Sequence, residues 1–255
     1  MDTVVILAAG KGRRMHESGA LVEKALVKAY GKELICYAID GSLSISARKI
    51  IIVLGEDSRV EAFVRETYSA KISSFSFIYD LKQIGRLNTF SLTSSIVGYP
   101  FLVMDCDIMF KKHSLMTFTE ICFEKHKKDR NIFAFTIGIQ NQTSLISPFL
   151  SVKENGDIVD LINYEDMPQY RRIPGEVLIP GGIIFFYFKN PFELCGNLLS
   201  MNIGSHNYLF RQLILNKKVQ YAPIDYLLNV NDMSDILTAE ETILSDNKNC
   251  FSDWS

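Results

Sequence analysis

Short apolar runs alternate with amphipathic segments over about the first 140 residues of the chain. The apolar runs have the length of buried strands and lie at 3–8, 49–54, 75–79, 101–104 and 132–137. Between them, apolar residues at helical spacing predict helices at 34–43, 60–68, 89–97 and 115–125. Strands that are apolar throughout and alternate with helices are typical of a parallel sheet covered on both faces. This half of the chain therefore predicts an α/β fold.

The pattern changes after about residue 140. Predicted strands at 150–152, 158–162 and 177–188 follow one another without full helices between them, and helical spacing returns at 208–215 and 232–244. The sequence shows no internal repeat, low-complexity tract or linker. We expect a single Rossmann-like three-layer α/β/α domain over residues 1–245, with a tail at 246–255. Its sheet should be mixed but mostly parallel, with extra antiparallel strands in the C-terminal half.

Composition and charge exclude several classes of protein. The 255 residues carry 27 Lys and Arg against 29 Asp and Glu, so the net charge of −2 lacks the basic excess of a nucleic-acid-binding protein. No apolar run approaches the roughly 20 residues that span a bilayer, and the apolar start lacks the preceding positive charge of a signal peptide. The five cysteines have the spacing of neither a zinc knuckle nor a disulfide framework. We therefore expect a cytoplasmic protein with no nucleic-acid partner and no membrane insertion.

A glycine-rich basic loop follows the first predicted strand and reads Leu7-Ala8-Ala9-Gly10-Lys11-Gly12-Arg13-Arg14. Ligands of parallel α/β sheets bind beyond the carboxyl ends of the strands, which is where this loop belongs. Its two glycines allow backbone N–H groups to approach an anion, and its three basic side chains add positive charge. The dinucleotide fingerprint needs a third glycine where Met15 stands, and a Walker loop is absent. An ordinary basic turn is the alternative, but three cations at the mouth of a buried strand favour a site for a tri- or pyrophosphate.

Two acids end another buried strand, in the sequence Met104-Asp105-Cys106-Asp107. Carboxylates two residues apart beyond a strand can share one divalent ion, and Mg²⁺ prefers such oxygen ligands together with phosphates. A solvated turn is the commoner role of an isolated Asp-x-Asp. The position of this pair at the same sheet edge as the glycine-rich loop favours a metal site.

These motifs resemble those of a known family. The sequences LAAGKGRRM, Glu23-Lys24-Ala25-Leu26 and Gly31-Lys32-Glu33-Leu34-Ile35 are similar to L-A-A-G-x-G-x-R-M, P-K-x-L and G-K-P-L-I of the nucleotidyltransferases that make activated sugars and alcohols. That family has a MobA-like, GT-A-like Rossmann domain. Glu23 and Glu33 stand where the family has prolines, which shape the backbone rather than perform chemistry. The resemblance extends from about Thr3 to Glu241.

The resemblance implies roles for the residues in these motifs. Lys24 occupies the position of the lysine that contacts the reacting phosphates, and the catalytic cations acting with it would be Lys11, Arg13 and Arg14. The residues at the positions of nucleotide contacts are Leu7, Ala8, Ala9, Gly10, Gly12 and Asp105.

The resemblance also implies a Mg²⁺ cofactor. Asp107 matches one of its ligands, and Asn231, in a segment that resembles the close of the family's domains, matches the other. Taken alone, the pair Asn231-Asp232 before a predicted helix favours N-capping by Asp232 or Ser234. Both roles can hold, because Asn231 precedes the expected cap.

The segment Gln83-Ile84-Gly85-Arg86-Leu87-Asn88-Thr89-Phe90-Ser91-Leu92 corresponds to the motif that reads the base. Sugar-phosphate members have Q-x-x-G-T-A there, whereas this chain is closer to the N-x-x-S-L of the phosphocholine and phosphonate cytidylyltransferases. The resemblance implies that Gln83, Asn88 and Ser91 contact the nucleotide and that its base is cytosine, with helix capping by Asn88 and Ser91 as the alternative. Further along, Glu176 and Gly182 match acceptor contacts, the latter in a strand similar to N-x-G-I-Y-x-F.

Together, the motifs predict transfer of a nucleoside monophosphate, CMP by the closest resemblance, from a triphosphate to a small phosphate monoester or phosphonate with release of pyrophosphate. The resemblance also implies that the product serves cell-surface polysaccharide biosynthesis. The alternatives are a sugar-1-phosphate nucleotidyltransferase that uses another triphosphate, a GT-A glycosyltransferase, which also uses Asp-x-Asp, and a nucleotide sensor without turnover. The oligomeric state stays open, with a homo-oligomer allowed.

Overall fold

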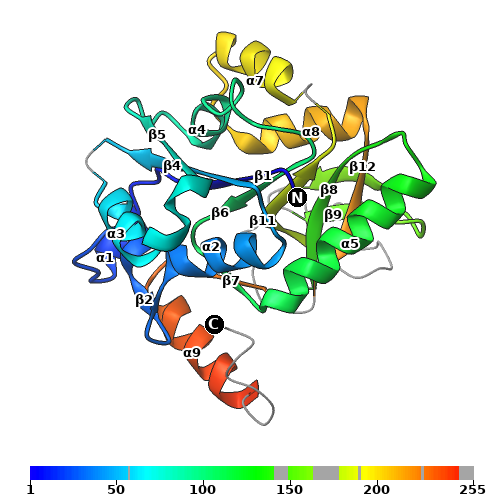
Figure 1. Ribbon diagram of the computed structural model, residues 1–255. Helices are drawn as coiled ribbons and strands as arrows, with labels where there is room; N and C mark the ends of the chain where they lie inside the picture. Colours follow the sequence, from blue (N-terminus) through cyan, green and yellow to red (C-terminus); the bar gives the residue numbers. More distant parts are fainter. Residues whose placement is uncertain (57, 141–148, 163–177, 189–190, 225–226, 247–255) are drawn as a thin grey trace.

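The computed structural model has a nine-stranded main sheet in the part of the chain that it describes (Figure 1). Described are residues 1–255 without 57, 141–148, 163–177, 189–190, 225–226 and 247–255. The strands pair in the order β12 (Lys218–Pro223), β8 (Ile132–Gln140), β11 (Leu178–Phe186), β6 (Phe101–Asp105), β1 (Thr3–Ala8), β4 (Lys49–Gly55) and β5 (Phe75–Asp80). The remaining two, β9 (Phe149–Val152) and β10 (Ile158–Ile162), continue from the start of β11.

The sheet has a parallel part and a mostly antiparallel part, which come from different halves of the sequence. In the N-terminal half, β6, β1, β4 and β5 are mutually parallel, so β1 and β6 end at the same edge. In the C-terminal half, β11 runs antiparallel to β6 and β8, and β9 and β10 form an antiparallel pair. The predicted α/β fold with added antiparallel strands is therefore confirmed.

Helices cover both faces of the sheet (Figure 1). The helices α2 (Leu34–Ser44), α3 (Val60–Thr67) and α5 (Lys112–Lys128) pack in one core cluster with Val4 and Ile6 of β1. The opposite cluster joins Val5 and Leu7 to α4 (Arg86–Ser91), α7 (Pro191–Ser200) and α8 (His206–Asn216). Alternate β1 side chains thus enter different cores, which is why the strand is apolar throughout.

A third, smaller core forms below the carboxyl ends of the strands. There α9 (Met233–Asp246) packs near α1 (Arg13–Glu17) and the hairpin-like pair β2 (Lys28–Ala29) and β3 (Lys32–Glu33). The short strands β7 (Ile108–Phe110) and β13 (Leu227–Asn229) pair antiparallel, with Met109 opposite Leu228. Since β7 follows Asp107 and β13 precedes Asn231, this pairing brings the two residues to one place. The remaining elements are the 3-10 turns η1 (Lys24–Leu26) and η2 (Ser69–Ser74).

The largest error in the predicted elements concerns the helix at 89–97. The helix α4 ends at Ser91, and turns occupy 92–96. The hydroxyls of Ser91 and Thr93 donate to the backbone carbonyls of Asn88 and Phe90, at 2.7 and 2.8 Å, and such bonds compete with helix propagation.

The helix α7 and the strands β7, β12 and β13 were not predicted, because each is short or lacks a clear apolar period. None of the helices in the described ranges is long and apolar enough to span a membrane.

Candidate active site

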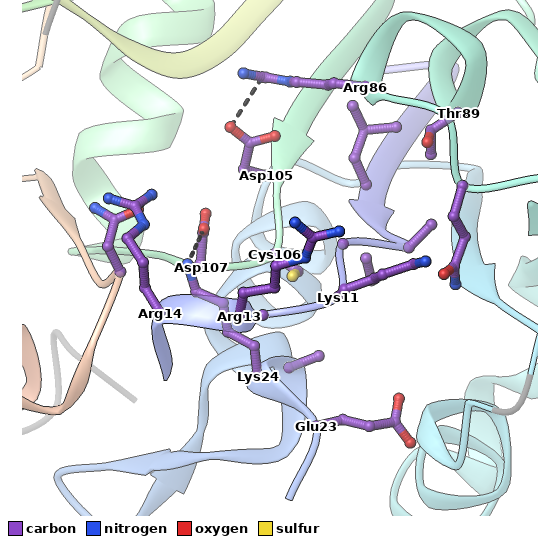
Figure 2. Close-up of a pocket in the computed structure, with 18 of the residues that line it drawn as sticks. Lys11, Arg13, Arg14, Glu23, Lys24, Arg86, Thr89, Asp105, Cys106 and Asp107 are labelled. Atoms are coloured by element: carbon purple, nitrogen blue, oxygen red, sulfur yellow. Dashed lines mark hydrogen bonds and ion pairs between the residues drawn. The ribbon is translucent and has the colours of Figure 1, made fainter. Parts of the chain in front are cut away.

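A cavity of about 640 Å³ opens at the carboxyl ends of β1 and β6 (Figure 2). Its walls come from the end of β1 and the loop after it, the segment around η1, the start of α4 and the loop before it, the end of β6 and the turn after it, and the second residue after β13. The lining residues are Leu7, Ala8, Ala9, Gly10, Lys11, Gly12, Arg13, Arg14, Glu23, Lys24, Ala25, Gln83, Gly85, Arg86, Thr89, Asp105, Cys106, Asp107 and Asn231. Five separate segments of the sequence therefore meet in one site.

The glycine-rich loop is shaped by Gly12, which immediately precedes α1. Its φ of 59° is left-handed, and a Cβ at this position would lie 3.0 Å from Cβ of Lys24. Both features favour glycine, because a side chain would strain the backbone and crowd the neighbouring segment. Gly10 differs, since nothing lies within 4 Å of its Cβ position. Its missing side chain leaves the backbone of the loop open to a ligand.

Lys24 faces Asp107 across the cavity floor, with 2.5 Å between Nζ and Oδ2 (Figure 2). Both side chains are largely buried. The preceding residue, Glu23, accepts hydrogen bonds from the Ser58 hydroxyl and the Arg59 backbone N–H, each at 2.6 Å. Glu23 therefore anchors the Lys24 segment to the start of α3, which supplies the rigidity that a proline would otherwise give.

Arg14 donates a hydrogen bond to Asn231 in the same cavity, with 2.8 Å between Nη2 and Oδ1. The backbone N–H of Val230 donates to the carbonyl of Asp107 at 2.9 Å, so Asn231 is held against the turn after β6. Asp232 caps α9 by accepting from the backbone N–H groups of Ser234 and Asp235. The capping role therefore belongs to Asp232, and Asn231 is left to line the cavity.

The oxygens of Asp107 and Asn231 suit a Mg²⁺ ion that takes its other ligands from phosphates and water. They lie on two backbone segments joined by the hydrogen bond to Val230, and Asp105 adds a further carboxylate to the same cavity. The described residues contain no cluster of three or more His, Cys, Asp or Glu that could hold a metal alone. The donor set therefore fits a metal that arrives with a nucleotide better than a metal enclosed by protein.

Asp105 is paired with Arg86, a residue that sequence analysis did not single out (Figure 2). Arg86 Nη2 lies 2.9 Å from Asp105 Oδ2. Burial, opposed by the Arg86 guanidinium, raises the pKa of Asp105 to about 7. The signal that could have revealed Arg86 is its place directly after Gly85, at the start of α4 and just beyond the loop that follows the carboxyl end of a parallel strand.

On the base side, a buried carboxylate organises the loop before α4. Asp80, at the end of β5, accepts hydrogen bonds from the Gln83 N–H, the Asn88 amide and the Thr89 hydroxyl, at 2.9, 2.9 and 2.6 Å. The amide of Gln83 lies over Gly55, whose Cβ position is 2.1 Å from Gln83 Nε2. Glycine at the end of β4 therefore leaves room for this side chain beside the cavity.

The structure does not bring all predicted nucleotide contacts into the cavity lining. Gln83 lines it, but Asn88 is bound to Asp80 and Ser91 to the carbonyl of Asn88, and Thr89 takes the place beside the cavity. On the acceptor side, Gly182 lines a second cavity of about 160 Å³, and Glu176 lies outside the described residues. The residues predicted to bind phosphate and metal thus all line one cavity, whereas those predicted to bind the base and the acceptor do so only in part.

Comparison with known proteins agrees with the motifs. Residues 4–128 match the family model of the MobA-like NTP transferase domain. Over these residues the chain matches a nucleotidyltransferase domain, which confirms the resemblance drawn from the sequence.

Several solved structures share the fold over nearly the whole chain. A putative glucose-1-phosphate thymidylyltransferase from Bacillus anthracis, solved with a sucrose, has a TM-score of 0.78 and 14% identity, covering 98% of this chain and 97% of its own. The CTP:phosphocholine cytidylyltransferase of Streptococcus pneumoniae follows with 0.73 and 16%, over 95% and 100%. The inositol-1-phosphate CTP transferase of T. maritima gives 0.71 and 14%, over 98% of each chain. At these identities the likeness establishes the common fold.

Proposed function

We propose that this nucleotidyltransferase transfers CMP from CTP to a small phosphate monoester or phosphonate and releases pyrophosphate. The observation that carries the proposal is the gathering of cationic and oxygen-bearing side chains in one cavity at the strand ends, namely Lys11, Arg13, Arg14, Lys24, Asp105, Asp107 and Asn231. Such a combination suits a triphosphate that carries a divalent ion.

The chemistry requires positioning and charge rather than a general base. An oxygen of the acceptor phosphate forms a bond to the α-phosphorus, and the bond from that phosphorus to the bridging oxygen breaks, so that its electron pair leaves on pyrophosphate. The acceptor phosphate is already anionic near neutral pH, because its second pKa is about 6. In-line transfer of this kind is accelerated by orientation and by neutralisation of developing charge.

Each cation has a place in this step. Lys11, Arg13 and Arg14, on the glycine-rich loop, would neutralise the leaving pyrophosphate, and Lys24 would hold the reacting phosphates. Asp107 and Asn231 would hold Mg²⁺, which when bound supplies further positive charge to the phosphate oxygens.

Two observations support cytosine as the base. The segment from Asn88 to Leu92 resembles that of phosphocholine and phosphonate cytidylyltransferases. Two of the three solved structures, the CTP:phosphocholine cytidylyltransferase and the inositol-1-phosphate CTP transferase, have CTP in their names. Gln83, whose amide lies beside the cavity over Gly55, is the candidate base contact. The second candidate function is a sugar-1-phosphate nucleotidyltransferase with another triphosphate, which the TM-score of 0.78 to a putative thymidylyltransferase favours.

A matrix of substrates tests both functions. CTP, dTTP, UTP, GTP and ATP are each incubated with Mg²⁺ and a panel of phosphate monoesters, and pyrophosphate release is followed. We expect CTP to exceed the other triphosphates at least tenfold, and Asp107→Ala to lower the rate about 10²-fold or more. Asp129→Ala, which removes an acid outside the cavity, is the control. Preference for another triphosphate would overturn the base assignment, and near-normal activity of Asp107→Ala would overturn the metal assignment.

The same assay separates the other classes of function. Release of a nucleoside diphosphate from a nucleotide sugar would identify a glycosyltransferase. Binding of a triphosphate with no pyrophosphate from any acceptor would identify a sensor.

A further inference from the structure

The second cavity, of about 160 Å³, meets the large one at Arg86, which lines both. Its polar lining comes from Thr136, His206 and Asn207, and its apolar lining includes Ile184 and Phe210. A cavity of about 150 Å³ accommodates a six-membered carbon ring, so this one has room for a group of roughly six to nine non-hydrogen atoms.

The Arg86 guanidinium has an unused hydrogen-bond donor at the junction, that is, where the two cavities meet. One of its nitrogens, Nη2, pairs with Asp105, but Nε is buried and has no hydrogen-bond partner among the described residues. A buried donor without a partner is costly, and a ligand oxygen is a common reason for one to persist. Gly182 keeps the backbone of β11 close to this ion pair, since its φ is 71° and a Cβ would come within 2.7 Å of Asp105 Oδ2.

The charge at the small cavity selects among acceptors of similar size. Its described lining contains no Asp or Glu, because Asp105 lines the large cavity only. The first turn of α8, at His206 and Asn207, adds the positive end of a helix dipole. Burial and the nearby Arg86 charge lower the pKa of His206 well below its ordinary 6.5, so its ring is neutral at pH 7. A quaternary ammonium would therefore find no carboxylate among the described residues that line this cavity, whereas hydroxyl groups would find polar partners.

We propose that the acceptor is the phosphate ester of a short uncharged polyol, whose phosphate binds Arg86 at the junction and whose carbon chain occupies the small cavity. This inference rests on the proposed nucleotidyl transfer and names its acceptor class. It gives Arg86 the task of presenting the attacking phosphate to the α-phosphorus in the large cavity. The size of the small cavity limits the polyol to about three to five carbons.

A matched panel of acceptors tests the class. With CTP and Mg²⁺, kcat/KM is measured for glycerol 3-phosphate, ribitol 5-phosphate, phosphocholine and glucose 1-phosphate. Glycerol and choline are close in size and differ in charge, whereas glucose exceeds the cavity. We expect at least one polyol phosphate to exceed both phosphocholine and glucose 1-phosphate tenfold or more. A preference for phosphocholine or for glucose 1-phosphate would overturn the proposal.

Variants of Arg86 test its part directly. Arg86→Gln should raise KM for the preferred acceptor at least tenfold while KM for CTP stays within twofold, and Arg86→Lys should recover part of the loss. The control is Lys82→Met, which removes an exposed cation from the same loop and lines neither cavity. An unchanged acceptor KM in Arg86→Gln, or an equal rise in both KM values, would contradict the assignment.

Equilibrium binding separates this inference from the proposed function. If no acceptor gives pyrophosphate, the proposed transfer fails, and calorimetry of glycerol 3-phosphate and phosphocholine, with a non-hydrolysable CTP analogue present, still tests the cavity. Tighter binding of glycerol 3-phosphate that weakens at least tenfold in Arg86→Gln would uphold the subsite. Tighter binding of phosphocholine, or no effect of the variant, would overturn it.

Discussion

The two ends of the active site are built in different ways. At the end proposed to bind phosphates, called the phosphate end below, the side chains come from strand ends and short turns. They pair with one another, as Lys24 does with Asp107 and Arg14 with Asn231. At the base and acceptor end, most polar groups bind the protein instead, around the carboxylate of Asp80. The first end is a set of paired charges at the edge of the sheet. The second is a loop whose shape depends on buried hydrogen bonds.

This difference explains why polar residues of one motif have different tasks. Asn88 and Thr89 are neighbours, and both bind Asp80, but only Thr89 also lines the cavity. Arg86, in the same short helix, lines both cavities. A substitution at the phosphate end should therefore act on the chemical step, and one at the other end should act first on the loop.

The largest expected effect is that of Lys24→Met at the phosphate end. It removes the ammonium that is proposed to hold the reacting phosphates, and loss of one such group commonly lowers kcat about 10²–10³-fold. Pyrophosphate release under saturating substrates measures it. The control is Lys28→Met, which removes a largely exposed lysine from the neighbouring strand. A rate within threefold of the wild type would show that the ion pair with Asp107 is structural only.

The contrast between the two ends also sets how much could be predicted from the sequence. The strands β1, β4, β5 and β6 are short, mostly apolar runs, and this pattern predicts them as buried strands. Parallel pairing then places their carboxyl ends at one edge of the sheet. Asp107 and the residues of the glycine-rich loop follow from that edge, because their motifs stand directly beside predicted strands. Lys24 stands beside no predicted strand, and its place is implied by the resemblance to the family motif P-K-x-L. The meeting of Asn231 with Asp107 depends on β7 and β13, which are too short to show a pattern.

The base and acceptor end is less predictable for a physical reason. Whether Asn88 faces the ligand or the protein depends on the buried Asp80, and a sequence shows Asp80 only as one acid after a strand. Arg86 and Gly182 come together through the antiparallel pairing of β11 with β6, which is long-range. Neither the contact of Asn88 with Asp80 nor the approach of Gly182 to Arg86 can be predicted from the residues that are adjacent in the sequence.

The second prediction concerns Asp80→Ala, which should destabilise the loop end of the site. The change leaves the donors of Gln83, Asn88 and Thr89 without their shared carboxylate, and we expect a loss of about 2–4 kcal/mol in the free energy of unfolding. Urea denaturation measures it, and KM for the triphosphate should rise as Gln83 loses its position. Ser76→Ala, on the same strand, should stay within about 0.5 kcal/mol. A comparably small effect of Asp80→Ala would mean that the loop holds its shape without the carboxylate.

The smallest expected effect tests whether the acceptor end is electrostatically coupled to Arg86. The pKa of His206 is lowered first by burial and then by the Arg86 charge, because both disfavour the imidazolium. Arg86→Gln should therefore raise the pKa of His206, while burial keeps it below 6.5. With only four histidines in the chain, NMR titration of the ring protons can follow this group, and Lys82→Met should leave its pKa unchanged.

The same shift in the pKa of His206 makes stability depend on pH. The folded state takes up the proton of His206 at lower pH than the unfolded state does. The neutral ring therefore contributes stability above about pH 6.5 that is lost on acidification, and Arg86→Gln should reduce this loss. An unaltered titration would separate His206 from Arg86 and remove the charge argument for an uncharged acceptor, leaving the phosphate end of the site untouched.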